Sequence, residues 1–174
     1  MKGHCHAQSL LQLLCDDLTG DADRNVIHGG PNGDVLYGLD GNDRLFGDAG
    51  IDTIRGGAGR DVMTGGADND IFAFDSIADA GIGNASRDIV TDFGVNADRI
   101  NLAVIDSNTI IAGNQTFSFI GAGAFTNVAG QLRFTASPSF QTTLVEGDVN
   151  GDGHADFQIM LQGNLILAAT DFFL

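Results

Sequence analysis

The sequence repeats itself every nine residues from Gly20 to Ala73, over six consecutive turns. The first place of each turn is glycine, the sixth is aspartate or, once, asparagine, and the eighth is apolar. In order of place, these residues are Gly20, Gly29, Gly38, Gly47, Gly56 and Gly65; Asn25, Asp34, Asp43, Asp52, Asp61 and Asp70; Ile27, Leu36, Leu45, Ile54, Met63 and Phe72. A fixed period with three constant places indicates stacked structural repeats, because a disordered acidic linker has no reason to keep an apolar residue in register.

Each repeat divides into a turn and a short strand. Its first six residues are rich in glycine and acid, and the last three predict a strand whose middle residue points inward. Glycine in places one, two and four predicts positive φ angles that bring backbone carbonyls close to an ion. At place four, Asp23, Asn32 and Asp68 tolerate that conformation, whereas Leu39 and Asp48 at place two fit it less well. Calcium takes six to eight oxygen ligands at roughly 2.3–2.6 Å, which such turns supply.

The predicted core is thin. One inward residue per nine, a single file ending at Phe72, cannot offset about 1–2 kcal/mol of ordering entropy per residue. Repulsion between crowded carboxylates acts in the same direction when no cation is bound. We therefore expect folding of the repeats to require metal.

These turns resemble the RTX calcium-binding repeats, G-G-x-G-x-D-x-U-x with U apolar, found in proteins exported by bacterial type I secretion. The resemblance implies an all-β fold, a calcium-binding parallel β-roll followed by a small antiparallel β-sheet or sandwich. It also implies that each ion lies between turns stacked two repeats apart. The first of the two turns would provide the carbonyls of places two and four and its place-six carboxylate. The second turn, two repeats later, would provide the carbonyls of places one and three and its own place-six carboxylate.

The resemblance assigns several sets of ligands for Ca²⁺ ions. Three sets are Gly30, Asn32, Asp34, Gly47, Ala49 and Asp52; Leu39, Gly41, Asp43, Gly56, Ala58 and Asp61; and Asp48, Gly50, Asp52, Gly65, Ala67 and Asp70. A weaker set, because Asn25 is neutral, joins Asp21, Asp23 and Asn25 to Gly38, Asp40 and Asp43. Gly57 and Gly59 are further candidate ligands.

The segment after the repeats, IFAFDSIADA…RDIVTDFGVNADRINL, looks like the stretch that closes the roll in serralysin-type secreted metalloproteases. That resemblance gives Asp79 and Asp88 a part in a last ion site; the alternative is that both are ordinary surface acids. The likeness extends to Leu174 and suggests three parts: a lead segment 1–19, the roll with its closing segment 20–91, and a C-terminal β subdomain 92–174.

The two ends of the chain carry weaker signals. We expect residues 1–19 to be a helix or disordered, without the pattern of a secretory signal peptide. His4, Cys5, His6 and Cys15 match no closed zinc site. The ending Thr170–Leu174, one acid before a hydrophobic terminus, resembles an uncleaved signal for the type I exporter.

The C-terminal half predicts short strands with phenylalanines in the core, namely Phe117, Phe119, Phe125, Phe134, Phe140 and Phe157. Within it, Asp148, Asn150, Asp152 and Asp156 have the spacing of the opening of an EF-hand loop, but Ile159 stands where the bidentate glutamate belongs. This segment is either a lone calcium site or a hydrogen-bonded acidic turn.

Charge and missing motifs restrict the function. A net charge of −15 argues against nucleic acid or an anionic membrane as partner, and no apolar run is long enough for a membrane span. H-E-x-x-H, G-x-S-x-G and P-loop motifs are absent. The first hypothesis is thus a non-catalytic calcium-binding module, secreted to the extracellular space through the type I exporter. One alternative is part of a secreted enzyme, a metalloprotease or polysaccharide-modifying enzyme with an N-terminal catalytic partner domain. The other is an adhesive protein that uses Tyr37, Phe46, Arg55 and Thr64.

Overall fold

The structure is a computed structural model that describes residues 15–174. These residues form strands and two short 3-10 helices, as the all-β prediction requires. The strands are β1 (Asp17–Thr19), β2 (Val26–Pro31), β3 (Val35–Gly41), β4 (Arg44–Ala49), β5 (Thr53–Gly59), β6 (Val62–Ala67), β7 (Ile71–Ala73), β8 (Asp88–Val90), β9 (Arg99–Asn101), β10 (Ser118–Phe119), β11 (Gln131–Ser137), β12 (Thr142–Asp148), β13 (Phe157–Gln162) and β14 (Phe172–Phe173). The helices are η1 (Ile77–Asp79) and η2 (Ala169–Asp171).

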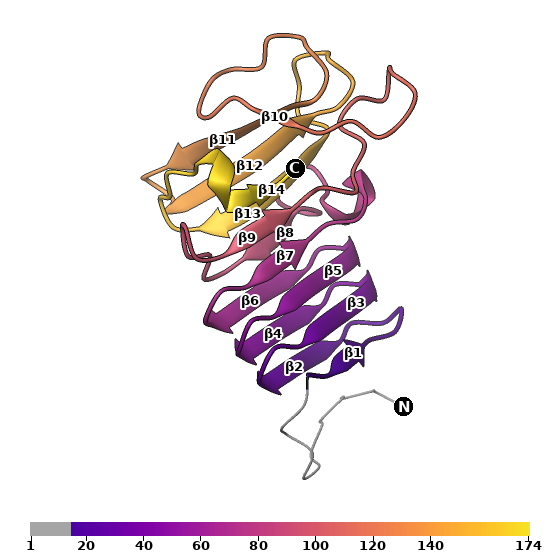
Figure 1. Cartoon of the computed structure of the whole chain (residues 1–174), viewed down its shortest axis with the longest axis vertical. Coiled ribbons are helices and arrows are strands. Elements are labelled where there is room, and N and C mark those ends of the chain that lie inside the picture. The colour runs from indigo at the N-terminus through magenta and orange to yellow at the C-terminus, as the bar shows by residue number, and fades with distance from the viewer. Residues whose placement is uncertain (1–14) are drawn as a thin grey trace.

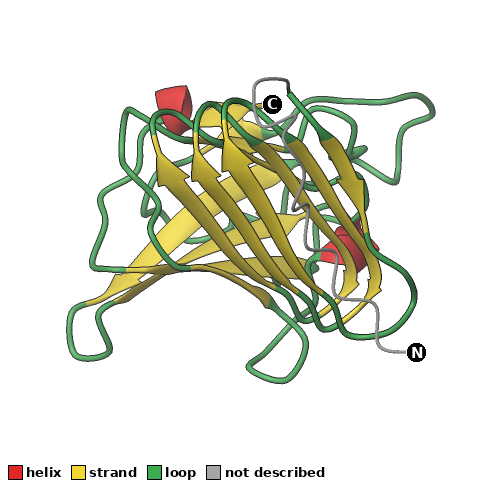
Figure 2. Ribbon diagram, turned by 90° about the horizontal axis from the view of Figure 1, so that it is seen from below, coloured by secondary structure: helices red, strands yellow, loops and turns green. Residues whose placement is uncertain are grey.

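Strands β1 to β7 stack as the parallel rungs of a roll, with alternate strands in two sheets. One sheet contains β1, β3, β5 and β7, and the other contains β2, β4 and β6. Each rung pairs with the strand two repeats later, so that Val35 lies opposite Thr53. The rungs succeed one another along the long axis of the molecule (Figure 1), and turns join them along both edges (Figure 2). Two nine-residue repeats therefore make one coil, as the period predicts.

The predicted single file of inward side chains fills the roll. The six place-eight residues are at most 1% exposed, from Ile27 at one end to Phe72 at the other. Val90 on β8 and Ile100 on β9 are fully buried and belong to the same apolar cluster. Each coil thus contributes two large apolar side chains to the core, which keeps the roll narrow.

The C-terminal strands extend the two sheets of the roll. The expected antiparallel sheet is present as β11, β12 and β13. It does not pack on the last coil as a separate layer, because β13 pairs in parallel with β8, which pairs in parallel with β6. On the other sheet, β9 pairs with β7 and β14 pairs with β9. The rungs and the C-terminal strands therefore share continuous sheets.

The expectation of a helical or disordered lead up to residue 19 is wrong for its last residues. Asp17–Thr19 is strand β1, and Leu18 pairs with Leu36 in the register of the later rungs. Residues 1–14, which include His4, Cys5 and His6, lie outside the described residues.

The prediction for the aromatic core is correct only in part. Phe117, Phe134 and Phe157 are buried, whereas Phe140 is 80% exposed on the loop after β11. Phe119 and Phe125 are half-buried. Phe125 lies beneath the guanidinium of Arg133, with 4.3 Å between the Arg133 Cζ and the ring centroid. Among residues 15–174, the structure has no helix with the length and apolar character needed to cross a membrane.

Candidate metal-binding edges of the roll

The place-six residues form two columns, one along each edge of the roll. The turns after β2, β4 and β6 bring Asp34, Asp52 and Asp70 to one edge, which we call the Asp52 edge. The turns after β1, β3 and β5 bring Asn25, Asp43 and Asp61 to the other, which we call the Asp61 edge. The sequence pattern thus places a residue of the same type at the same position in each successive coil.

Hydrogen bonds connect each column from coil to coil. On the Asp52 edge, the backbone N–H of one place-six residue donates to Oδ1 of the next, from Asp34 to Asp52 at 2.7 Å and from Asp52 to Asp70 at 3.0 Å. On the Asp61 edge, the corresponding bonds from Asn25 to Asp43 and from Asp43 to Asp61 are both 2.7 Å. One oxygen of each carboxylate is therefore used to hold the coils in register.

The other oxygen of these carboxylates has no donor. Oδ2 is buried and without a hydrogen-bond partner in six residues of the described chain: Asp34, Asp43, Asp52, Asp61, Asp70 and Asp88. Their side chains are at most 2% exposed. A buried carboxylate oxygen without a donor is costly, which favours a cation or a proton beside it.

Backbone carbonyls face these free oxygens. A Cβ added to Gly47 would lie 2.3 Å from Asp52 Oδ2 and 2.5 Å from the Gly65 carbonyl oxygen. A Cβ added to Gly38 would lie 2.6 Å from Asp43 Oδ2 and 2.3 Å from the Gly56 carbonyl oxygen. Each pair of oxygens, one from a carboxylate and one from a carbonyl of the next coil, belongs to one of the ligand sets that the resemblance implies. The residues present therefore fit a hard cation such as Ca²⁺.

The same geometry corrects the reason for glycine in place one. The place-one glycines do not have positive φ angles. Glycine is needed there because a Cβ would occupy the space between the carboxylate and carbonyl oxygens. The turn angle is instead supplied by places two and four.

The expectation of positive φ at places two and four is correct from the second turn onward. Leu39 (φ 73°) and Asp48 (φ 74°) adopt it in spite of their side chains. At place four, Asn32 (φ 81°) and Asp68 (φ 79°) do so as well, together with the glycines of the other turns.

The first turn departs from this geometry, and neither Asp21 nor Asp23 has a positive φ. Asn25 Oδ1 accepts from the Asp21 N–H at 2.7 Å, and Asp21 Oδ1 accepts from the Asn25 amide at 3.0 Å. The oxygen that corresponds to the free Oδ2 of the later turns is thus already hydrogen-bonded, which fits a weaker site there.

Burial raises the pKa values of the carboxyl groups in the two columns. Burial, and then neighbouring carboxylates, raise the pKa of Asp52 and Asp70 to about 6 and that of Asp61 to about 7. The most deeply buried member, Asp88, has its pKa raised to about 9 for the same reasons. The pKa values of Asp34 and Asp43 are also raised, mainly by burial. The columns therefore favour a proton or a cation over a bare negative charge.

The columns continue beyond the repeats. The N–H of Asp61 donates to Asp88 Oδ1 at 2.7 Å, so Asp88 is the next member of the Asp61 edge. Asp79 lies outside this column and caps η1, where its Oδ2 accepts from the N–H groups of Asp75 and Ser76. Its charge nevertheless contributes to the raised pKa of both carboxyls. In Asp61 it follows burial and the charge of Asp43, and in Asp88 it follows burial and the charge of Asp61.

Sequence reasoning missed two column members on the Asp52 edge. Asp16 donates its N–H to Asp34 Oδ1 at 2.7 Å, and Asp98 accepts from the Asp70 N–H at 3.0 Å. Asp16 lies nine residues before Asn25 and was detectable from the period. Asp98 lies 28 residues after Asp70, so the period does not reach it. Its Oδ2 accepts from the Gly94 N–H at 2.7 Å, which closes this end of the column with backbone donors.

The Asp148–Asp156 loop has a different character. Asp148 accepts from the N–H groups of Gly151 (2.6 Å) and Gly153 (2.9 Å). Asp156 accepts from the N–H of Val149 (2.7 Å) and from both the N–H and the side-chain amide of Asn150. Because its own donors occupy these oxygens, the geometry favours the hydrogen-bonded turn over a calcium loop.

No three His, Cys, Asp or Glu side chains among the described residues converge as a metal-binding group. A cation at either edge would thus depend on backbone carbonyls, as the implied ligand sets require.

The comparisons with known proteins agree with this geometry. A family model described as the RTX calcium-binding nonapeptide repeat matches residues 16–45 and 37–72, in four copies. A comparison with curated proteins finds no match. RTX repeats bind calcium in general.

Two solved structures share the fold. The AlgE6R3 subunit of the Azotobacter vinelandii mannuronan C5-epimerase is 25% identical, with a TM-score of 0.55, and the match covers 98% of this chain and 84% of that one. The AlgE6R2 subunit of the same enzyme is 23% identical, with a TM-score of 0.63, over 90% of this chain and 91% of that one. Residues 16–72 of this chain therefore match the RTX calcium-binding nonapeptide repeat, and the chain has the β-roll fold of these two subunits.

Proposed function

We propose that this chain is a non-catalytic module that folds when Ca²⁺ fills the two edges of its roll. The observation that carries the proposal is the set of six buried Oδ2 atoms without a donor, from Asp34 to Asp88. On the Asp52 edge, ions would lie between the turns of Asp34 and Asp52 and of Asp52 and Asp70. On the Asp61 edge, they would lie between the turns of Asp43 and Asp61, with a last site that adds Asp88 and Asp79.

Folding coupled to calcium follows from the energetics of the columns. Without a cation, the buried carboxylates repel one another, and their free oxygens lack hydrogen-bond donors. An ion that binds only the folded state adds its binding free energy to folding by mass action. Residues 20–91 would be the part that responds to calcium, and residues 92–174 would extend its sheets.

Isothermal titration calorimetry of the chelated protein tests the proposal. We expect more than one Ca²⁺ per chain with a large favourable enthalpy, and no comparable heat from Mg²⁺, which prefers strict octahedral geometry. Fewer than two ions per chain, or equal heats for the two metals, would refute it.

We also propose that the chain is exported unfolded and acts outside the cell. In the folded chain, the C-terminal segment that resembles an exporter signal is part of a sheet. Asp171 is fully buried and accepts from the N–H groups of Asn96 (2.9 Å) and Ala168 (2.8 Å). Phe172 is 6% exposed on β14. An exporter that reads this segment would have to engage it before the roll folds, which agrees with export under low calcium.

A second candidate function is association with an acidic polysaccharide, as a partner of a catalytic domain. The solved relatives are subunits of an enzyme that acts on mannuronan, a polymer of carboxylated sugars. One observation on this chain favours the idea. A hollow of about 510 Å³ on the outer face of β11–β13 is lined by the apolar residues Phe140, Leu144 and Met160 and by the polar residues Asn84, Arg87, Thr135, Ser137 and Thr142. An exposed ring, hydroxyls and a guanidinium suit a sugar with a carboxylate.

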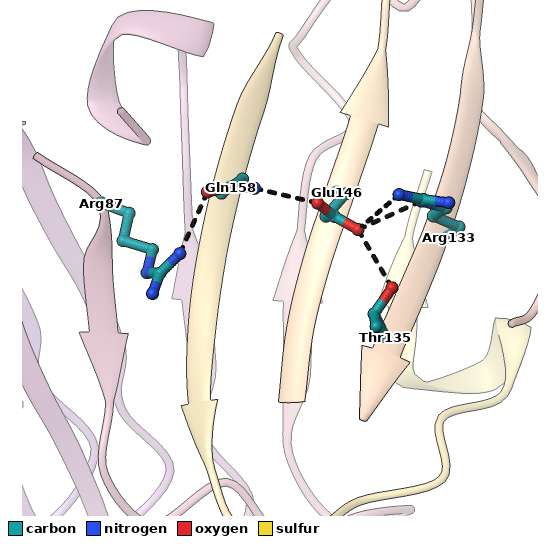
Figure 3. A network of polar contacts seen from close by, with 5 residues as sticks. All are labelled: Arg87, Arg133, Thr135, Glu146 and Gln158. Atoms are coloured by element: carbon teal, nitrogen blue, oxygen red, sulfur yellow. Dashed lines mark hydrogen bonds and ion pairs between the residues drawn. The ribbon is translucent and has the colours of Figure 1, made fainter. Parts of the chain in front are cut away.

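A polar network connects two residues that line this hollow, Arg87 and Thr135 (Figure 3). The Arg87 guanidinium donates to Gln158 Oε1 at 3.1 Å, and the Gln158 amide donates to Glu146 Oε1 at 2.9 Å. Glu146 Oε2 accepts from Arg133 and from the Thr135 hydroxyl, both at 3.1 Å. The network spans four neighbouring strands or their starts and holds Arg87 in place.

The outward pairs Tyr37–Arg55 and Phe46–Thr64, which an adhesive protein would use, lie on different sheets, so they form no common adhesive row.

Binding of mannuronate oligomers to the calcium-saturated protein tests the second candidate. We expect weak, salt-sensitive binding that Phe140→Ala reduces several-fold, with Phe46→Ala on the roll as the matched control. Absence of binding, or equal binding by the two variants, would remove the polysaccharide from the function.

A further inference from the structure

The arginines of this acidic chain are distributed unequally between the two edges. Arg24, Arg60 and Arg87 directly precede Asn25, Asp61 and Asp88, so each stands beside a place-six residue of the Asp61 edge. The equivalent residues on the Asp52 edge are Gly33, Ile51 and Asn69. The Asp61 edge thus has an arginine beside three of its members, whereas on the Asp52 edge Arg99 stands beside Asp98, at the end of the column.

Two of these arginines, together with Arg44, lie around one carboxylate. Arg24, Arg44 and Arg60 line a hollow of about 280 Å³ together with Asp43. Within residues 15–174, none of the three arginines forms an ion pair, since the pairs join other residues. The Arg60 Nε is buried and has no hydrogen-bond partner in this part of the chain. Their positive charge is therefore not neutralised by a direct contact.

The charges felt by the columns agree with this arrangement. Burial raises the pKa of Asp43 and of Asp88, and Arg24 opposes the first rise while Arg60 opposes the second. On the other edge, the charges that act on Asp52 after burial come from Asp34, Asp48 and Asp68. Those that act on Asp70 come from Asp98, Asp52 and Asp92. The field on Asp52 and Asp70 is thus acidic, whereas at Asp98, the end of this column, Arg99 opposes the raised pKa.

We propose that the two edges bind Ca²⁺ with different affinities, and that Arg24 and Arg60 set the difference by weakening the Asp61 edge. The inference rests on the proposed calcium-binding function. A divalent cation is attracted by extra carboxylates and repelled by a nearby guanidinium, and calcium sites are tuned by the charge of their surroundings. The Asp52 edge fills first as calcium rises, and the Asp61 edge fills at a higher concentration.

A residue-resolved calcium titration tests the inference. The amide signals of Asp34 and Asp52 report one edge, and those of Asp43 and Asp61 report the other, in NMR spectra of the labelled protein. We expect midpoints that differ on the order of tenfold, as a unit charge at this range implies. The double variant Arg24→Gln, Arg60→Gln should bring the Asp43 and Asp61 midpoint down to that of the other edge, without moving the latter.

Controls separate this inference from the function on which it rests. Arg55 on β5 pairs with Asp75 at 3.3 Å. The variant Arg55→Gln removes this positive charge and should leave the Asp43 and Asp61 midpoint unchanged. A single common midpoint in the parent protein, or a double variant that behaves like Arg55→Gln, overturns the inference but leaves calcium binding intact. Failure of all four amides to respond to calcium overturns the proposed function itself.

Discussion

Asp34 donates its backbone N–H to Oδ1 of Asp52 at 2.7 Å, while Oδ2 of Asp52 is buried and has no donor. One carboxylate thus has two roles. Its first oxygen fixes the register between coils, and its second faces the carbonyl oxygen of Gly65 in the following coil. The same division recurs at Asp43 and Asp61 on the other edge. Structure and cation binding therefore depend on the same side chain, which is why we expect folding and calcium binding to be inseparable.

Asp52→Asn separates the two roles. The amide oxygen can still accept from Asp34, but an uncharged group replaces the free oxygen that two proposed ions share. We expect the calcium midpoint of folding to rise by about tenfold or more, since loss of one charged ligand costs roughly 1.5–3 kcal/mol. Asp152→Asn, at an exposed position in the loop before β13, should leave the midpoint unchanged. Equal midpoints for Asp52→Asn and the parent would mean that Oδ2 binds no ion.

Gly47→Ala tests the space beside the carboxylate. The added Cβ would lie 2.3 Å from Asp52 Oδ2 and 2.5 Å from the Gly65 carbonyl oxygen, so the backbone at Gly65 would have to shift. We expect loss of at least about 2 kcal/mol of stability in calcium, measured by urea unfolding. Gly94→Ala is the control, because its Cβ would meet no atom closer than 3.4 Å. A Gly47→Ala variant as stable as the control would show that this space is not constrained.

Leu39→Gly should stabilise the calcium-bound protein. Leu39 has a φ of 73°, which the Cβ of an L-residue disfavours, and it is 47% exposed, so little apolar burial is lost. Relief of the strain exceeds the added freedom of the unfolded chain, and we expect a gain of about 0.5–1 kcal/mol. Leu36→Ala, at a fully buried position, should instead cost about 2–5 kcal/mol in the same urea experiment. Destabilisation by Leu39→Gly would contradict the strained turn.

The pH dependence should reverse between the calcium-free and calcium-bound states. Burial raises the folded-state pKa of Asp52 and Asp70 to about 6, of Asp61 to about 7 and of Asp88 to about 9. Protonation therefore favours the folded state: this contribution is complete below the unfolded pKa of about 3.9 and is lost as the pH rises through 6 to 9.

Far-UV circular dichroism of the chelated protein between pH 4 and pH 9 measures this effect. We expect more β-structure at the acidic end, although net positive charge at still lower pH would oppose it. In calcium the order reverses, because protons compete with the ion for the same oxygens. More structure at pH 9 than at pH 5 in the chelated protein would contradict the raised pKa values.

The nine-residue period was sufficient to predict the coils, the file from Ile27 to Phe72 and the two columns, because all three follow from the repeat itself. It did not extend to β1, although Asp16 and Leu18 occupy places six and eight, because no glycine marks that turn. The period does not reach Asp98, because the insertion between β7 and β8 and one extra residue place it 28 residues after Asp70, whereas Asp70 follows Asp52 by 18.

Other features depend on long-range pairing that a local pattern does not encode. Alternating residues predicted the strands β11–β13, but not that β13 joins the edge of β8 and makes the sheets continuous. Phe140 is a large apolar residue of the kind that usually lies in a core, yet it lies on a turn beyond the end of β11 and faces solvent. The difference in charge between the edges also required the fold, because it appears only when alternate turns are separated onto opposite sides.

The most direct test of the central claim is a calcium titration of the chelated protein followed by far-UV circular dichroism, with magnesium as the control. We predict a cooperative gain of β-signal in calcium and none in magnesium at the same concentration. A chelated protein that already has the full β-signal at neutral pH, and that calcium leaves unchanged, would show that the roll is a solenoid whose folding does not depend on metal.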